Sequence, residues 1–385
     1  MIRRYFDWAA TAIPGPPPRE GSAFPYYGNP SSPHAEGREA RKALEEARSR
    51  CAAVLGVRRE ELVFTSGGTE SNALVLFSLL CRPRAGGNGG AAELLYSAVE
   101  HPSIRENSAV LERLGVACAK IAVGREGGVS RAALEKALAK NPRAKMAALM
   151  AVNNETGAVN ALRDLSAAAK RGSERLHIHC DLVQAAGKIP VDIGGWGIDS
   201  ASISAHKIGG PRGAGLLWLK KPLPVLIRGG GQEGRIRPGT ENTAGALELA
   251  RRLEERAAPE SLDLSYREAS ARMAALLARL RRIPRFVPVP ESRADEDPRF
   301  SPWILQAAFS GIPGEVMVRA LDERGFAVST GSACSSADKK RPVLDAMGVD
   351  PATAFSGIRI SQGWSTGMDD IEALAETVEE LCEKL

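Results

Sequence analysis

The chain has 385 residues, of which 44% are hydrophobic and 25% are charged, an ordinary globular composition. Its length predicts about two domains, or one large α/β domain with an appendage. Lys and Arg outnumber Asp and Glu by only 51 to 46, without a run of five like charges, which argues against direct binding to nucleic acid.

The cysteines are widely spaced, and no stretch of the sequence suits a membrane. No two of the six cysteines lie closer than 30 positions, so neither a zinc knuckle nor a CxxC redox pair is present. The N-terminus has two arginines but lacks the apolar run of a signal peptide. No apolar run reaches the roughly 18 residues that a spanning helix needs. We therefore expect a cytoplasmic protein that has no membrane segment and works in a reducing environment.

Short β-like runs alternate with helical patterns through the first part of the chain. The seven expected strands are 62–65, 93–98, 116–123, 145–152, 176–181, 200–205 and 215–219. Helical spacing predicts helices over 103–114, 131–139 and 161–171. This alternation is typical of a mostly parallel sheet with helices on both faces. Ligands bind at the carboxyl ends of such strands, so a site is expected just after Thr65, Ala98, Val152, Asp181 and Ala205.

The pattern changes after about Pro259. A long amphipathic helix is expected over 266–282 and a closing helix over 369–385. Strand-like runs lie between them, at 304–309, 327–329 and 357–361. We interpret this stretch as a smaller α+β domain. The expected division is a large domain over 15–258 and a small domain over 259–385, which residues 1–14 complete.

The segment Ser66–Asn72, SGGTESN, follows the apolar run LVFT and opens a helical stretch. Glycines there free backbone N–H groups, and a helix N-terminus adds partial positive charge, so the turn suits a phosphate. A glycine turn with a Ser or Thr helix cap would explain the same residues. Alone, this motif leaves both interpretations open.

A lysine follows a later expected strand, in the segment SISAHKIGGPRGAG. Lys207 is flanked by Ser204 and His206 and followed by glycines. A lysine in a partly desolvated cleft loses its proton more easily and becomes a nucleophile that forms a Schiff base. A solvated loop lysine is the commoner fate of any single lysine, so this motif needs support from elsewhere.

That support comes from HIHCDLVQAAGK, residues 177–188. Alternation along a strand places His177, His179 and Asp181 on one face. His-x-His-x-Asp is able to ligate a metal, but no further His, Cys or Asp cluster supplies another ligand, and no metal site is expected. Alternatively, Asp181 pairs with the protonated ring nitrogen of a pyridoxal phosphate (PLP) cofactor. The two histidines are then structural.

The order of these motifs is similar to that in the fold-type I PLP enzymes. A phosphate turn comes first, a strand that ends in aspartate follows about 110 residues later, and a lysine lies 26 residues after the aspartate. More specifically, the chain is similar to the cysteine desulfurases, the NifS-like group of the class V aminotransferase superfamily. The matching segments are DWAAT (7–11), GNPSSPH (28–34), VFTSGGTESN (63–72), EHPSI (100–104), VNNETG (152–157), HCDLVQAAGK (179–188), SAHKIGGPRGAG (204–215), GGGQEGRIRPGTEN (229–242), STGSACSS (329–336) and IRIS (358–361).

The resemblance implies roles for individual residues around the cofactor. Lys207 holds PLP covalently, Asp181 keeps its ring nitrogen protonated, and Gln184 donates a hydrogen bond to its phenolic oxygen. His101 stacks on the ring and serves as an acid–base group. The phosphate is expected to bind Gly68, Thr69, Ser204 and His206, together with Thr240 of a second subunit, so that a homodimer is the working unit.

The resemblance also implies where the substrate, free L-cysteine, binds. Arg359 takes its carboxylate in a two-pronged hydrogen bond, and Asn153 lies beside both substrate and cofactor. Asn29 lies near the same pocket. Cys334, in the small and polar segment STGSACSS, accepts the sulfur as a persulfide and hands it on. The expected acceptor is a partner protein, such as an iron–sulfur scaffold or a tRNA-thiolation enzyme.

Other functions stay open on the sequence alone. A selenocysteine lyase or an aminotransferase would use the same fold, although Cys334 in a loop argues against simple transamination. An inactive scaffold is an alternative of another class, and the presence of every catalytic residue argues against it. The sequence does not say which pathway receives the sulfur.

Overall fold

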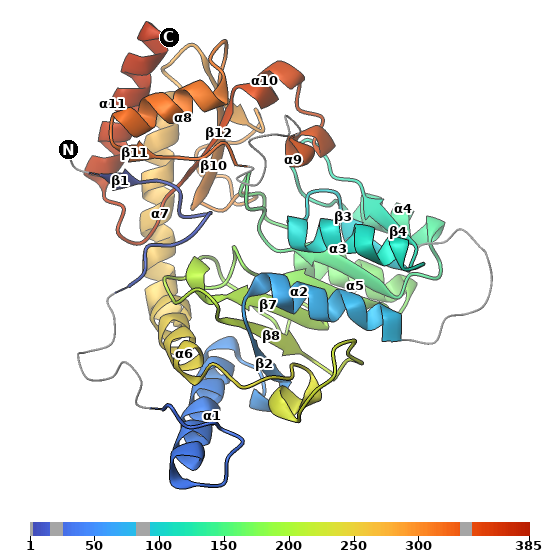
Figure 1. Ribbon diagram of the computed structural model, residues 1–385. Helices are drawn as coiled ribbons and strands as arrows, with labels where there is room; N and C mark the ends of the chain where they lie inside the picture. The colour runs from blue at the N-terminus through green and yellow to red at the C-terminus, as the bar shows by residue number, and fades with distance from the viewer. Residues whose placement is uncertain (1–2, 16–25, 82–92, 332–340) are drawn as a thin grey trace.

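The computed structural model describes residues 3–15, 26–81, 93–331 and 341–385. Its largest unit is a seven-stranded sheet with the strand order β2-β8-β7-β6-β5-β3-β4 (Figure 1). The strands are β2 (Leu62–Thr65), β3 (Leu94–Ser97), β4 (Cys118–Ile121), β5 (Met146–Met150), β6 (His177–Asp181), β7 (Ser200–Ser204) and β8 (Gly215–Leu219). The sequence prediction of seven strands in a mostly parallel sheet is confirmed.

One strand departs from the parallel arrangement. β8 is antiparallel to both of its neighbours, β2 and β7, whereas the pairs from β7 to β4 are parallel. Because β2 and β7 flank β8 and both oppose it, they run in the same direction. The carboxyl ends of β2, β3, β5, β6 and β7 therefore meet at one edge of the sheet.

Alternating side chains of the strands pack into two hydrophobic cores, one on each face of the sheet. Leu94 and Tyr96 of β3 pack on one face, with α2 (Gly68–Phe77) and α3 (Pro102–Arg113), while Leu95 between them packs on the other. The helices that contribute to the core on that second face are α1 (Ala35–Leu55), α4 (Arg131–Lys140), α5 (Leu162–Gly172) and α6 (Thr243–Ala257). The sheet is thus buried on both faces, as a mostly parallel sheet requires.

A separate hydrophobic cluster is built from the C-terminal part of the chain and includes Phe6 from the N-terminus. Its three-stranded antiparallel sheet has the order β12-β10-β9, and β1 pairs with β11. The helices and strands of the C-terminal part, with the N-terminal strand, are β1 (Arg4–Tyr5), α7 (Pro259–Leu280), β9 (Phe286–Val289), β10 (Ile304–Phe309), α8 (Gly314–Glu323), β11 (Phe326–Ala327), α9 (Pro342–Ala346), α10 (Pro351–Phe355), β12 (Gly357–Ser361) and α11 (Met368–Lys384).

Helix α7 links the two parts of the molecule. It begins at Pro259, where the sequence predicts a change of pattern, and runs from beside α6 to the region of β10 and α11 (Figure 1). The N-terminal strand lies in the same region as the C-terminal helix. This arrangement agrees with residues 1–14 joining the C-terminal part, and the division into two domains stays a prediction.

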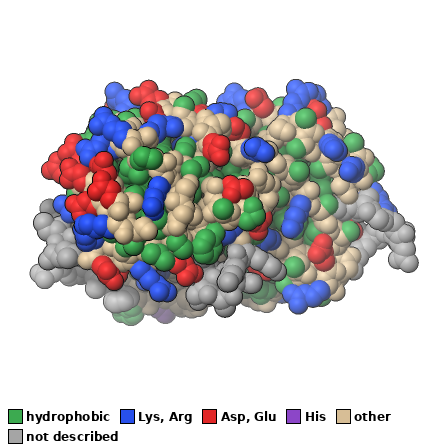
Figure 2. Space-filling model, turned by 90° about the horizontal axis from the view of Figure 1, so that it is seen from above, with side chains coloured by type: hydrophobic (Ala, Val, Ile, Leu, Met, Phe, Trp, Pro, Cys, Tyr) green, Lys and Arg blue, Asp and Glu red, His purple; other side chains and the backbone are tan. Residues whose placement is uncertain are grey.

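The surface seen in Figure 2 mixes charges of both signs. Among the side chains that the structure describes there, Lys and Arg lie scattered between Asp and Glu and do not form a stripe. Within the described part of the chain, no helix is both long enough and apolar enough to cross a membrane.

Candidate functional site

A cavity of about 1060 Å³ lies at the edge where the strand ends meet. Its walls come from the loops after β2, β3, β5, β6 and β7, and from the N-terminal segment and β12. Nine residues singled out in the sequence line it: Gly68, Thr69, His101, Asp181, Gln184, Ser204, His206, Lys207 and Arg359. The rule that ligands bind at carboxyl ends of strands therefore located the cavity correctly.

Lys207 ends a short 3₁₀ turn, Ala205–Lys207, that follows β7. Its Nζ donates hydrogen bonds to the carbonyl oxygens of Ala9, at 2.6 Å, and Ala10, at 2.7 Å. Burial, together with the guanidinium of Arg359, lowers the pKa of Lys207 to about 8. A substantial fraction of this lysine is consequently neutral near pH 8, as a nucleophilic amine must be.

Asp181 is the last residue of β6 and is buried. Both of its carboxylate oxygens accept hydrogen bonds: Oδ1 from the backbone N–H of Val183, at 2.9 Å, and Oδ2 from Nδ2 of Asn72, at 2.8 Å. Asp181 also lines the cavity, so its carboxylate is held in a fixed orientation at the cavity wall.

A hydrogen-bonded chain links Asp181 to His101 on the neighbouring loop. Asn72 Nδ2 donates to Asp181 and also to Ser103 Oγ, and the Ser103 hydroxyl lies 2.8 Å from Nδ1 of His101. The Asn72 carbonyl oxygen lies 2.8 Å from Nε2 of His179. His179 is buried, so its pKa falls to about 3 and its ring is neutral. The two histidines of the HIHCD motif thus have structural partners, because Ser200 contacts His179 and also His177.

His101 caps the N-terminus of α3. Its Nδ1 accepts a hydrogen bond from the backbone N–H of Ser103, which places the proton of the neutral ring on Nε2. Burial lowers the pKa of His101, while the negative charge of Asp181 acts in the opposite direction. His101 therefore offers its Nε2–H as a donor at the cavity wall.

The turn before α2 allows another group to approach its backbone closely. Gly67 has φ +151°, and a side chain on Gly68 would collide with Val183. No side chain caps the helix, whose first backbone hydrogen bond runs from Ser71 to Gly67. The N–H groups of the first turn therefore remain available to an anion at the cavity edge. Ser204, on the adjacent β7, completes this wall.

His206 lies on the same wall and is neutral. Its Nδ1 is 3.1 Å from the hydroxyl of Thr11, and burial lowers its pKa to about 4, with Lys207 contributing less. A neutral imidazole still offers one N–H donor to a phosphate oxygen.

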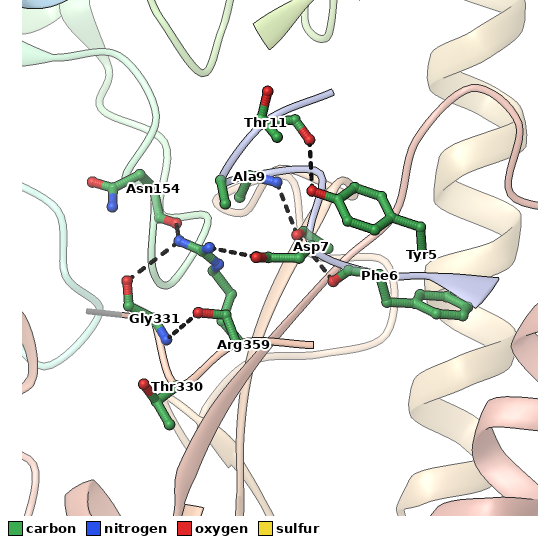
Figure 3. Close-up of polar contacts among 12 residues, drawn as sticks. Tyr5, Phe6, Asp7, Ala9, Thr11, Asn154, Thr330, Gly331 and Arg359 are labelled. Atoms are coloured by element: carbon green, nitrogen blue, oxygen red, sulfur yellow. Dashed lines mark hydrogen bonds and ion pairs between the residues drawn. The ribbon is translucent and has the colours of Figure 1, made fainter. Parts of the chain in front are cut away.

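Arg359 points from β12 toward the N-terminal segment (Figure 3). Its Nη2 forms an ion pair with Asp7 Oδ1 at 2.7 Å, and its Nη1 donates to the carbonyl oxygens of Asn154, at 3.0 Å, and Gly331, at 3.4 Å. Its Nε has no partner in the described structure. The guanidinium is therefore held in place from three sides.

Three predicted site residues lie elsewhere. Asn153 is buried but does not line the cavity: its Oδ1 accepts from the backbone N–H groups of Glu155 and Thr156, so it shapes the loop after β5. Asn29 and Thr240 are exposed and also lie outside the cavity wall. Cys334 lies outside the described residues. The binding roles of Asn153, Asn29 and Thr240 and the catalytic role of Cys334 stay predictions.

The loop that carries Thr240 is anchored by a buried ion pair. Arg48 of α1 binds both carboxylate oxygens of Glu233 at 2.8 Å, and Glu233 also accepts from the backbone N–H of Phe64. Glu233 and Arg235 both have positive φ, at 45° and 66°, which is strained for residues with side chains. The ion pair holds this strained loop beside β2.

Arg48→Met is expected to destabilise the protein by about 3–5 kcal/mol, because it leaves Glu233 buried without a counter-charge. Urea unfolding followed by tryptophan fluorescence measures the change. Arg50→Met on the same helix is the matched control: Arg50 and its partner Glu254 are about one third exposed, and its loss should cost less than about 1 kcal/mol. Equal losses in the two variants would show that the Arg48 pair does not anchor the loop.

Several residues of the site were missed in the sequence. Asp7, Asn72, Glu100 and Glu155 all lie within the matching segments, but nothing in the sequence marks them individually as site residues. Both glutamates line the cavity, and each has one carboxylate oxygen without a partner among the described residues. Burial raises the pKa of Glu100 and of Glu155. No spacing rule marks such groups, because their importance comes from residues far away in sequence.

Comparisons with known proteins identify the family of this chain. Residues 4–374 match the family aminotransferase class-V. The chain is 36% identical to cysteine desulfurase IscS of Dictyoglomus turgidum, over 93% of this chain and 88% of the relative. It is 34% identical to an IscS-like cysteine desulfurase of Mycobacterium tuberculosis, over 97% of this chain and 95% of the relative.

Solved structures show the same fold. A NifS-like protein superposes with a TM-score of 0.87 at 30% identity, with both chains covered completely. A structure of SspA in complex with cysteine superposes with a TM-score of 0.76 at 28% identity, covering 93% of this chain and 98% of that one. The chain belongs to the aminotransferase class-V family, in its group of NifS-like cysteine desulfurases.

Proposed function

We propose that this enzyme uses PLP to convert L-cysteine to L-alanine and moves the sulfur atom onto Cys334 as a persulfide. The observation that carries the proposal is the convergence on one cavity of a lysine with a lowered pKa, a buried aspartate and a helix N-terminus without a side-chain cap among the described residues. The persulfide sulfur then passes to an acceptor protein in the cytoplasm, such as an iron–sulfur scaffold or a tRNA-thiolation enzyme.

The residues present fit PLP. The N–H groups at the start of α2, with Ser204 and His206, suit its phosphate, Asp181 suits its ring nitrogen and Lys207 suits its aldehyde carbon. When bound, PLP supplies an electron sink that acidifies the α-proton of the substrate. Asp181 would support this by pairing with a proton on the ring nitrogen, and its two hydrogen bonds hold the carboxylate in place for that contact.

Lys207 is the group that moves the α-proton, and His101 assists at the substrate sulfur. As a free amine, Lys207 would take the α-proton, and the carbonyl oxygens of Ala9 and Ala10 would stabilise its ammonium form. His101 lines the same cavity, and the N–H of its Nε2 is a hydrogen-bond donor for the sulfur of the substrate. Both groups are held by short contacts, so no large rearrangement is needed to place them.

Arg359 binds the substrate carboxylate. Arg359 lines the cavity, and its ion pair with Asp7 keeps the guanidinium in place. The segment that contains Cys334 is flanked by Gly331 on one side and by Pro342 on the other, and both residues line the cavity. This placement supports attack by the Cys334 thiolate on the substrate sulfur.

The proposed reaction is tested by supplying the holoenzyme with L-cysteine and a thiol reductant and measuring alanine and sulfide. Equal amounts of the two products are expected. Selenocysteine in place of cysteine tests the alternative of a selenocysteine lyase. Alanine formed from selenocysteine but not from cysteine would favour that alternative. An inactive scaffold would release neither product.

The rate at which PLP combines with the cofactor-free enzyme should rise about tenfold per pH unit below pH 8 and level off above it. The reason is that Lys207 attacks only as the neutral amine, and its pKa is lowered to about 8. Stopped-flow absorbance measures the rate, with N-acetyl-lysine amide as the reference for changes in PLP itself. Asp7→Asn removes a charge that raises the pKa of Lys207, so the plateau should begin at lower pH. An unchanged profile in that variant would contradict the assignment.

The working unit is proposed to be a homodimer in which Thr240 reaches the phosphate bound by the other subunit. Thr240 is exposed, and Arg237 in the same loop pairs with Glu70 next to the phosphate turn. Thr240→Glu should therefore weaken PLP binding about tenfold or more. Sedimentation should show a dimer. Mixed dimers of Thr240→Glu and Lys207→Ala chains should regain one site with the affinity of the unmodified enzyme, whereas a fully active monomer would contradict the proposal.

A further inference from the structure

Lys188 is a buried lysine that the proposed reaction does not use. It ends the motif HCDLVQAAGK and is only 2% exposed. Its carbonyl oxygen accepts a hydrogen bond from the indole of Trp303 at 2.7 Å. Burial lowers the pKa of Lys188 to about 7, with smaller contributions from the positive charges of Lys207 and Arg359. No carboxylate within the described structure pairs with it.

The hydrogen bonds of Lys188 explain why it is there. Its Nζ donates to Oε1 of Gln184 at 2.8 Å, one turn earlier in the chain. On the opposite side, Nε2 of Gln184 donates to the carbonyl oxygen of Ala9, also at 2.8 Å. A backbone carbonyl only accepts, so Ala9 requires the Nε2 end of the amide on its side, and Lys188 Nζ supports this orientation by donating to Oε1.

This orientation has a consequence for the cavity that Gln184 lines. The Nε2 atom carries two hydrogens, and the Ala9 carbonyl takes one of them. The second N–H is left for a ligand. If the amide were turned over, its carbonyl oxygen would face the phenolic oxygen of the cofactor and repel it.

We propose that Lys188 is a positioning residue, which fixes the Gln184 amide so that an N–H faces the phenolic oxygen of PLP. This inference rests on the proposed function, because it requires that PLP binds in the cavity. Lys188 touches neither substrate nor cofactor in this assignment and acts only through Gln184. It stabilises the deprotonated phenolic oxygen of the cofactor and so lowers the pH at which the bound cofactor titrates.

The test is a spectrophotometric pH titration of the bound cofactor in the holoenzyme, made on Lys188→Met, Gln184→Leu and the double variant. Gln184→Leu removes the N–H donor and should raise the titration midpoint by about one pH unit, and Lys188→Met, which leaves the amide held by Ala9 alone, should raise it by no more than that. If Lys188 acts through Gln184, the double variant should shift no further than Gln184→Leu alone. Lys170→Met, which removes a half-buried lysine of α5 outside the cavity wall, is the matched control and should leave the midpoint unchanged.

Methionine removes a desolvated charge without a counter-ion, so Lys188→Met should melt at no lower temperature than the unmodified enzyme. Lys188→Leu is a second apolar replacement if the methionine packs poorly. An unshifted midpoint in both would overturn the inference, and shifts that add in the double variant would show that the charge of Lys188 acts directly. A protein that shows no cofactor absorbance at all would instead contradict the proposed function itself.

Discussion

Replacing Lys207 by alanine is expected to lower the rate of alanine formation from L-cysteine by about 10³-fold or more, because one amine both holds the cofactor and moves the α-proton. The purified variant should lose the absorbance of the covalently bound cofactor. Borohydride reduction of the unmodified holoenzyme should fix the cofactor on the peptide that contains Lys207. The measurements are absorbance spectra, mass spectrometry of the reduced peptide and chromatographic alanine assays.

Lys221→Ala provides the control, since Lys221 is exposed and lies after β8, outside the cavity wall. It should keep the colour and the rate of the unmodified enzyme. Added free amines, such as methylamine, should restore part of the lost activity of Lys207→Ala, because they replace a proton acceptor but not its position. Label found on a different lysine would show that the nucleophile has been assigned to the wrong residue.

Replacing Cys334 by alanine should have an equally large effect on turnover and none on cofactor binding. Steps before sulfur transfer do not need the Cys334 thiol, so the variant should bind PLP and cysteine with unchanged affinity. Alanine release should fall by about 10²-fold or more, because the substrate sulfur has lost its acceptor. Equilibrium titration with PLP and an alanine assay separate the two effects.

Cys118→Ala is the matched control for the loss of a thiol. Cys118 lies on the edge strand β4, and burial raises the pKa of its thiol to about 12, which makes it a poor nucleophile. This variant should keep full activity. If Cys334→Ala still made alanine at the unmodified rate, sulfur would leave the substrate without a persulfide, as in a lyase.

Much of the fold could be predicted because apolar runs and helical spacing carry strong signals. The antiparallel direction of β8 was not predicted, because the composition of a strand does not show its direction, although the length of its connection does. The reason is visible in the connection: only Ala205–Ala214 joins β7 to β8, which is too short for the helical crossover that parallel strands use. Helix α1 was missed because the core side of this helix is formed largely by alanines such as Ala40, Ala43 and Ala47, which give a weak amphipathic pattern.

Some residues of the site could likewise be predicted from the sequence and others could not. Motifs immediately after strands, such as those of Lys207 and Asp181, were recognisable because strand ends meet at one edge of a sheet. Asp7 and Asn72 were not, because their partners Arg359 and Asp181 lie 352 and 109 positions away. Lys188 was hidden for a different reason: a buried lysine without a counter-ion contradicts the usual expectation that lysines are solvated.

The most direct test of sulfur transfer to Cys334 is the stoichiometry of the unmodified holoenzyme with excess L-cysteine and no reductant or acceptor. Turnover should stop after about one alanine per active site, because the persulfide blocks the thiol that the next cycle needs. Mass spectrometry should then find one added sulfur atom on the Cys334 peptide and none on the peptides of the other five cysteines. Alanine formation that continues for many cycles, with Cys334 unmodified, would contradict the proposed persulfide mechanism.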